Sequence, residues 1–365
     1  MYLSRILKSK KVALNVVLGV FLMFVSCKTF AMQAEEHASE ASETHNQEEF
    51  NPSEVILEHI ADSHSWHLWG TTTVPLPVIL YTDKGVEVFS SKHFEHGHAD
   101  YQGQYYTYRL IKDKVSIVGP GEELTAGANM LNMHNKLIDF SITRNVVSMW
   151  LSILVLLIIF LGISSAYKKR EGKAPKGLQS FLEPVILFVR DDIARPNIGY
   201  KYQRFMPLLL TVFFFIFINN LIGLIPFFPG GSNLTGNIAV TFVLAIITLI
   251  VVNVNGNKYY WKHIFAPDVP VWLYPIMWPV ELVGIISRPF ALMIRLFANI
   301  TAGHIIVLSL ISLIFVFKSF AIAPVSVAFV VFMDVLELLV AALQAFIFTL
   351  LTALFIGTAI EEHHH

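Results

Sequence analysis

"IMWPVELVGIISRPFALMIRLFANITAGHIIVLSLISLIFVF", residues 276–317, is a long apolar tract with an arginine near its middle. A helix crosses the roughly 30 Å hydrocarbon core of a bilayer with about 20 apolar residues, so this tract is long enough to span a membrane. Holding Arg295 at such a depth costs on the order of 2.5–3.5 kcal/mol. A charge retained at that cost indicates a function inside the membrane.

The composition points to an integral membrane protein rather than a soluble enzyme. Of 365 residues, 55% are hydrophobic and only 15% are charged, and a net charge of −1 gives no reason to expect nucleic acid as a partner. Residues 178–193 mix apolar and charged side chains, which is typical of a helix lying at the membrane interface. Further apolar tracts occupy residues 146–167, 205–228, 238–254 and 321–360. We therefore predict an all-α polytopic membrane protein with about five transmembrane helices plus one interfacial helix.

The last apolar tract is too long for an upright span. Residues 325–356 contain neither proline nor glycine, and a continuous helix of that length would measure about 48 Å at 1.5 Å per residue. Either the helix is strongly tilted, or residues 324–334 lie in the interface and a shorter span follows. We expect the last two helices to be long and tilted.

The N-terminal third has a different character. Basic residues, an apolar run and small residues predict a signal peptide over residues 1–31, with an uncleaved anchor helix as the alternative; Cys27 is the only cysteine, so no intrachain disulfide can form. Residues 32–54 form an acidic, histidine-containing segment that we expect to be disordered. Residues 55–140 predict a small extramembrane domain of β character, with a hairpin turn at residues 83–85 and one strand within "YQGQYYTYRLI" (residues 101–111).

Basic residues orient the chain in the membrane. Five lysines and arginines cluster in residues 168–176, directly after the first span, and the linker between the second and third spans carries none. The positive-inside rule therefore places residue 168 in the cytoplasm and residues 55–140 outside. A signal peptide requires the same orientation, so the two arguments agree.

Polar residues gather around the intramembrane arginine. Asn299 follows Arg295 at i+4 on the same helical face, whereas His304, nine residues on, points to the opposite side. In the last tract Glu337 and Gln344 share one face, and Asp334 lies one turn before Glu337. An ion pair between Arg295 and Glu337 or Asp334 that only locks two helices together is the structural alternative.

Side-chain chemistry separates these residues into two roles. Arginine does not release its proton in proteins, so Arg295 acts as a fixed cation that favours the ionised form of a nearby carboxylate. His304 and Glu337 can gain and lose protons and are able to relay them.

These residues resemble the a subunit of F-type ATP synthase. "LMIRLFANITAGHIIVL" (292–308) is similar to the family's arginine signature, and "NNLIGLIPF" (219–227), "LQAFIFTLLTALFI" (343–356) and "EEH" (361–363) resemble its other motifs. Many bacterial members carry glutamate where His304 stands and histidine where Glu337 stands. This exchange of the two residue types suggests a relay pair. Ala298 replaces the usual glycine.

The resemblance implies a role and a set of partners. Arg295 would face the carboxylate of a rotor c-ring, His304 and Glu337 would form the outer proton path, and Asn299 and Gln344 would support them. Residues 145–362 would be the transmembrane domain of a stator subunit in a bacterial inner membrane, with a cytoplasmic C-terminus. It would be joined to the c-ring, the b subunit stalk and the rest of the synthase. The chain itself would be non-catalytic, without cofactor, metal or nucleic acid.

Two alternative functions come from other classes. A secondary transporter would use Arg295 to bind an anionic substrate, but such folds usually contain two similar halves, and no such repeat is visible. The histidines of the N-terminal domain could bind zinc, although a solvated histidine-rich loop explains them better. These histidines are His64, His67, His93, His96 and His98.

Overall fold

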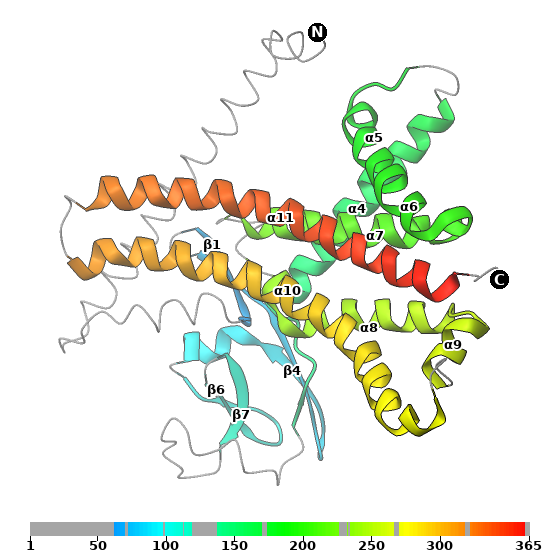
Figure 1. Ribbon diagram of the computed structural model, residues 1–365. Coiled ribbons are helices and arrows are strands. Elements are labelled where there is room, and N and C mark those ends of the chain that lie inside the picture. The colour runs from blue at the N-terminus through cyan, green and yellow to red at the C-terminus, as the bar shows by residue number, and fades with distance from the viewer. Residues whose placement is uncertain are drawn as a thin grey trace. The chain divides into compact units, whose positions relative to one another are not determined.

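A computed structural model describes the chain in ten stretches, which carry its β-strands and long helices (Figure 1). The described residues are 62–69, 72–97, 99–111, 113–118, 137–169, 174–225, 232, 234–265, 270–317 and 322–361. Contacts divide the chain into two compact units. The first comprises Met1–Ser148, Gly223–Ser232 and His304–Val335, and the second comprises Met149–Ile222, Asn233–Gly303 and Leu336–His365. The predicted signal peptide and the segment 32–54, with Cys27, lie outside the described residues, as do the last histidines.

The N-terminal region forms three small antiparallel sheets, as its β-branched runs predict. Their strand orders are β1-β2, β4-β3-β8 and β5-β6-β7. The strands are β1 (Ser65–Trp69), β2 (Thr72–Pro75), β3 (Pro77–Thr82), β4 (Gly85–Ser90), β5 (Tyr101–Gln102), β6 (Thr107–Ile111), β7 (Lys114–Val118) and β8 (Ile138–Asp139). Thr82 pairs with Gly85 across the predicted turn, and Gly85 adopts a φ of 146°. Glycine is favoured there because such a φ is strained for other residues.

The sequence predicted one strand in residues 101–111, but these residues form a hairpin of the two strands β5 and β6. Gly103 donates a backbone hydrogen bond to Tyr106 O at 2.9 Å and closes the turn. A Cβ at Gly103 would lie 2.2 Å from Glu87 Oε2, so a side chain there would displace the Glu87 carboxylate. Sequence periodicity alone does not reveal this close approach, because Glu87 belongs to another sheet.

A buried carboxylate holds the hairpin in place. Glu87 is 6% exposed and accepts hydrogen bonds from Gln104 N at 2.8 Å, Tyr105 N at 3.1 Å and the Tyr108 hydroxyl at 2.7 Å. Burial and the hydrogen bond to Glu87 raise the pKa of Tyr108 above its usual range. The neutral phenol is therefore retained as a donor, and a buried charge with three donors is stable where an unpaired one would not be.

The remainder of the chain is helical and long enough to cross a membrane. Four helical segments, or five if one bent pair is counted as a single span, meet the length and hydropathy expected of transmembrane helices among the described residues. This agrees with the predicted polytopic architecture. The long helices are α4 (Arg144–Lys169), α7 (Tyr202–Gly223), α8 (Ile238–Val254), α10 (Tyr274–Phe317) and α11 (Ala323–Ile360), with the short α9 (Lys258–Phe265) bent from α8 by 102°.

The last two helices, α10 and α11, are continuous (Figure 1). α11 has 38 residues, which corresponds to about 57 Å at 1.5 Å per residue. α10 stays helical through Pro279 and Pro289. The single long helix agrees with the first alternative considered for residues 321–360, and the tilt that its length demands of a 30 Å core stays a prediction.

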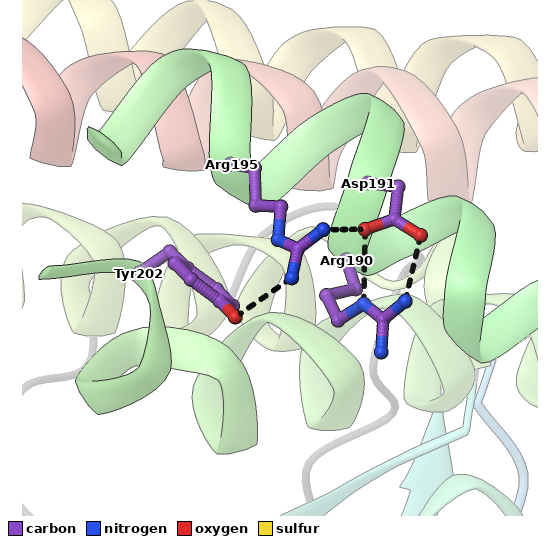
Figure 2. Close-up of polar contacts among 4 residues, drawn as sticks. All are labelled: Arg190, Asp191, Arg195 and Tyr202. Atoms are coloured by element: carbon purple, nitrogen blue, oxygen red, sulfur yellow. Dashed lines mark hydrogen bonds and ion pairs between the residues drawn. The ribbon is translucent and has the colours of Figure 1, made fainter. Parts of the chain in front are cut away.

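A charged helical segment precedes α7, where the sequence predicted an interfacial helix. α5 (Leu178–Phe188) continues into a π-helical turn (Val189–Ala194) and α6 (Arg195–Ile198). Figure 2 shows that Asp191 lies between two arginines: Arg190 Nη2 is 2.8 Å from Asp191 Oδ2, and Arg195 Nη1 is 2.8 Å from Asp191 Oδ1. Arg195 also donates to the Tyr202 hydroxyl at 3.2 Å, which links α6 to the first residue of α7.

Candidate functional site

Arg295 lies on the outer face of α10 rather than in the protein interior. Its neighbours Leu292 and Leu296 are buried in the second unit's core and Met293 is also buried, whereas Arg295 itself is exposed. No ion pair or hydrogen bond joins Arg295 to another of the described residues. The internal ion pair considered above is therefore absent from the described part of the chain, and the guanidinium is available to a group on another molecule.

The residues around Arg295 on this face are small or polar. Ala298 and Asn299 are exposed one turn on, and Ala302 is exposed one turn further. We call Arg295, Ala298, Asn299 and Ala302 the arginine face. Small side chains let a neighbouring helix approach closely in a bilayer, so the arginine face can receive a partner helix near the fixed charge. The i+4 prediction for Asn299 is confirmed by the continuous helix.

Glu337 is directed toward α10. It is 6% exposed, and a Cβ added at Gly303 would lie 3.1 Å from both its Cδ and its Oε1 atoms. The carboxyl group of Glu337 therefore packs against the residue that precedes His304 in the chain. A glycine at 303 leaves the space that this carboxyl group occupies.

His304 begins the part of α10 that belongs to the first unit. Its ring is partly buried, and its Nε2 atom would be 3.9 Å from a Cβ placed on Gly223, the last residue of α7. Because α10 is continuous, nine residues at about 100° each place Arg295 and His304 on opposite sides of the helix. The spacing therefore still predicts that the permanent cation and the titratable imidazole lie on opposite sides of α10.

Gln344 is buried in α11, two turns beyond Glu337. Between these residues, the backbone of α11 is held by an amide of α7, since Asn220 Nδ2 donates to Ala341 O at 3.2 Å. The Asn220 side chain also accepts a hydrogen bond from Thr235 Oγ1 at 2.6 Å. All three partners of this network are buried.

The sequence alone predicts no role for Asn220 or Gly303. Adjacent amides in an apolar span, Asn219 and Asn220, are a signal that could have drawn attention to this position, because polar groups in a membrane interior need partners. Gly303 carries no such signal. Its importance depends on Glu337, which is distant in sequence.

Replacing Gly303 with alanine tests the placement of Glu337. The added methyl group must displace a carboxyl group that it would meet at 3.1 Å, and we expect ATP-driven proton pumping by the complete complex to fall about threefold to tenfold. Gly284→Ala is the matched control. Gly284 lies on the same helix, and a Cβ there meets no atom within 4 Å. Equal pumping by both variants would show that the position of Glu337 is immaterial.

The described residues hold no group of three histidine, cysteine, aspartate or glutamate side chains that could bind a metal ion. Two of the candidate histidines have defined surroundings. His64 is buried, and His93 hydrogen-bonds Ser90 O through Nδ1 at 2.9 Å. His98 and the side chains of His67 and His96 lie outside the described part, so the zinc hypothesis gains no geometric support.

Comparison with known proteins divides the chain into two matched regions. A family model described as "ATP synthase A chain" matches residues 146–357, and one described as "Domain of unknown function (DUF8433)" matches residues 55–140.

Several curated relatives are similar over the same helical part. The chain is 50% identical over 232 residues to ATP synthase subunit a of Chloroherpeton thalassium, covering 62% of this chain and 69% of the relative. It is 47% identical over 235 residues to ATP synthase subunit a of Chlorobium phaeobacteroides, covering 62% and 68%. It is 43% identical over 235 residues to ATP synthase subunit a of Myxococcus xanthus, covering 62% and 76%.

Proposed function

This chain belongs to the ATP synthase A chain family, and from that premise we propose that its arginine face contacts a rotor c-ring and that its helices carry protons to and from it. The chain is a multi-pass membrane protein and a membrane-embedded stator subunit of ATP synthase, not the catalytic one. The transporter alternative has no support among the relatives. The single observation that carries the proposal is the exposed position of Arg295, near the middle of a helix long and apolar enough to cross a membrane, with no partner among the described residues.

The proposed topology follows the charge distribution of the sequence. Residues 1–31 act as a signal peptide, residues 32–54 form the acidic, histidine-containing segment, and residues 55–140 form an extracytoplasmic domain. Residues 145–362 form the transmembrane domain in a bacterial inner membrane and end in the cytoplasm. The basic residues in the last turn of α4, Lys168 and Lys169, support this orientation.

The proposed mechanism assigns one step to each site residue. A proton from the outer side passes His304 and Glu337 and reaches a carboxylate of the ring, and the neutral carboxyl group then turns into the lipid. When a protonated carboxyl group arrives next to Arg295 from the other side, the positive charge favours its ionisation, and the proton leaves inward. Each charge that crosses a 100 mV potential supplies about 2.3 kcal/mol.

Asn299 and Gln344 have supporting roles in this proposal. Asn299 shares the exposed face of Arg295 and is available to hydrogen-bond a ring carboxyl group as it approaches. Gln344 is buried two turns from Glu337, where its amide supports the polar interior of the proton path. The b subunit stalk would hold the chain still while the ring moves.

Photo-crosslinking tests which face of the chain meets the ring. Ile294, which is 38% exposed beside Arg295, is replaced by p-benzoylphenylalanine in the complete complex. We expect an adduct with the c subunit. Leu157 on α4 is the control, because it is 53% exposed on a helix with few buried residues and should react with lipid alone. An adduct with the c subunit from position 157 and none from 294 would refute the proposed face.

A further inference from the structure

A mixed-charge cluster lies in the first unit, where the β region joins α4, and the proposed mechanism does not use it. His64 is 4% exposed, and its Nε2 atom is 3.5 Å from Asp139 Oδ2. Asp113 accepts a hydrogen bond from Ser63 and interacts electrostatically with His64, Arg144 and Asp62. We call Asp62, His64, Asp113, Asp139 and Arg144 the foot cluster, and they are the titratable and charged groups described there.

The foot cluster is tied directly to the start of the first span. Arg144 N donates to Ser63 O at 2.9 Å, and Asn145 N donates to Asp62 Oδ1 at 3.1 Å. These bonds fix the segment before β1 to the N-terminal turn of α4. Three carboxyl groups against one guanidinium give this end of the span a negative balance, which attracts protons from the outer water.

The environment of the carboxyl groups differs within the cluster. Burial raises the pKa of Asp113. Burial opposes ionisation of Asp139 as well, but the nearby imidazole of His64 and the hydrogen bond from Ser141 N outweigh it and lower the pKa of Asp139. Carboxyl groups whose pKa values are shifted by burial and by specific partners are typical of functional sites.

A line of polar groups continues from the foot cluster toward His304, all within the first unit. The Ser232 hydroxyl donates to Asn145 Oδ1 at 2.8 Å, and both residues are buried. A Cβ on Gly223 would lie 3.6 Å from Ser232 O and 3.9 Å from His304 Nε2. The backbone carbonyl of Ser232 and the imidazole of His304 thus both border the space beside Gly223.

Two polar atoms beside this line favour a hydrated path over a rigid lock. Ser148, one turn beyond Arg144 on α4, is 1% exposed, and its hydroxyl makes no hydrogen bond with the other described residues. His64 Nδ1 is likewise buried and makes no hydrogen bond with the other described residues. Buried polar atoms of this kind are usually satisfied by ordered water, and a chain of water and hydroxyl groups conducts protons.

We propose that the foot cluster is the outer mouth of the proton path, so that the N-terminal β region collects protons and delivers them to His304 by way of Asn145 and Ser232. The proton is taken from outer water by a carboxylate of the cluster. The Ser232 oxygen accepts this proton from bound water and releases its own hydroxyl proton, which turns away from Asn145 Oδ1, through bound water to the imidazole. This inference rests on the function proposed above and gives the β region a part in it.

The test measures how ATP synthesis depends on the pH of the outer side. The complete complex in liposomes is driven by a fixed membrane potential at constant inner pH, with the outer pH set to 6 or to 8.5. For a chain carrying Asp62→Asn and Asp113→Asn, we expect synthesis within twofold of the parent at pH 6 and about tenfold lower at pH 8.5. At pH 6 protons are abundant and reach the path without collecting groups, whereas at pH 8.5 they are scarce and the carboxylates are needed to collect them.

A structural role for the cluster would give a different result. If the cluster were only structural, the double variant would lower ATP synthesis by the same factor at both pH values. Either that outcome or no loss at all overturns the proposal. Asp100→Asn is the matched control, since Asp100 is a carboxylate of the same region that pairs with Arg109 near the surface, and it should change nothing. Rates are normalised to the ATP hydrolysis of assembled complex.

Two further variants complete the experiment. Ser232→Ala removes one hydroxyl outside the cluster and keeps the proposal falsifiable if the double variant does not assemble; it should slow synthesis about threefold at pH 8.5 only. Arg295→Gln should stop synthesis at both pH values. If Arg295→Gln stays active, the proposed function fails, whereas an unaffected double variant with inactive Arg295→Gln refutes the outer mouth alone.

Discussion

Arg295→Gln will abolish proton-coupled ATP synthesis by the complete complex, with a loss of at least 100-fold. Glutamine keeps a polar side chain of similar length but removes the permanent charge that opposes a protonated ring carboxyl group. A hundredfold loss of rate corresponds to about 2.7 kcal/mol of activation free energy. One charge–charge interaction in a poorly solvated site is strong enough to supply this energy. The measurement is synthesis driven by an acid–base transition in vesicles, together with ATP-driven acidification.

Lysine at position 295 should fail as well, although it carries the same formal charge. Lysine releases its proton more readily than arginine when it is desolvated, so the fixed cation becomes a titratable group. We expect Arg295→Lys to lose most of its coupling. If Arg295→Lys retains more coupling than Arg295→Gln, the difference measures how much the positive charge alone contributes to coupling.

Arg288→Gln is the matched control for both variants. Arg288 is an exposed arginine of the same helix, two turns earlier, whose guanidinium lies 5.6 Å from the ring centroid of Phe355. It should retain coupling within about threefold, because its charge already stacks on the chain's own aromatic ring. Normal synthesis by Arg295→Gln would remove the basis of the proposed mechanism.

The second large effect is expected at Gly357, where α11 passes the α6 segment. A Cβ at Gly357 would lie 1.8 Å from Asn197 O and 2.9 Å from Asn197 C. Both are backbone atoms, so no side-chain rotation relieves the overlap. Overpacking costs about 1–3 kcal/mol and occasionally more, and a backbone collision of this size belongs at the upper end.

The end of α11 has little room to move away from this collision. Asn257 N donates to Ala359 O at 2.8 Å, and Asn257 Nδ2 donates to Ile360 O at 2.6 Å. Terminal helix carbonyls need such partners, so a displaced α11 loses these bonds too. We therefore expect Gly357→Ala to lower the amount of assembled complex in membranes about tenfold.

Immunoblotting and ATP hydrolysis of purified membranes measure this loss of assembly. Gly162→Ala is the control, because a Cβ at Gly162 in α4 meets no atom within 4 Å, and its assembly should stay at the parent level. Normal assembly of Gly357→Ala would mean that α11 and Asn197 are not in contact in the complex.

The positions of the helices, their approximate number and the residue types available for proton transfer follow from local properties of the sequence. Apolar length sets a span regardless of its neighbours, and the absence of proline and glycine from residues 325–356 made α11 continuous. The fixed charge of Arg295 and the spacing of Asn299 and His304 are likewise local properties of one helix.

The tertiary fold sets which polar groups meet. It left Arg295 exposed and without an acid among the described residues, placed Glu337 against Gly303, and joined Asn220 to Ala341. It also showed that Gly103 closes a hairpin over Glu87. Each of these facts depends on the distance between segments that are far apart in the chain. Helical periodicity gives the direction of a side chain on one helix, but it gives no distance between two helices.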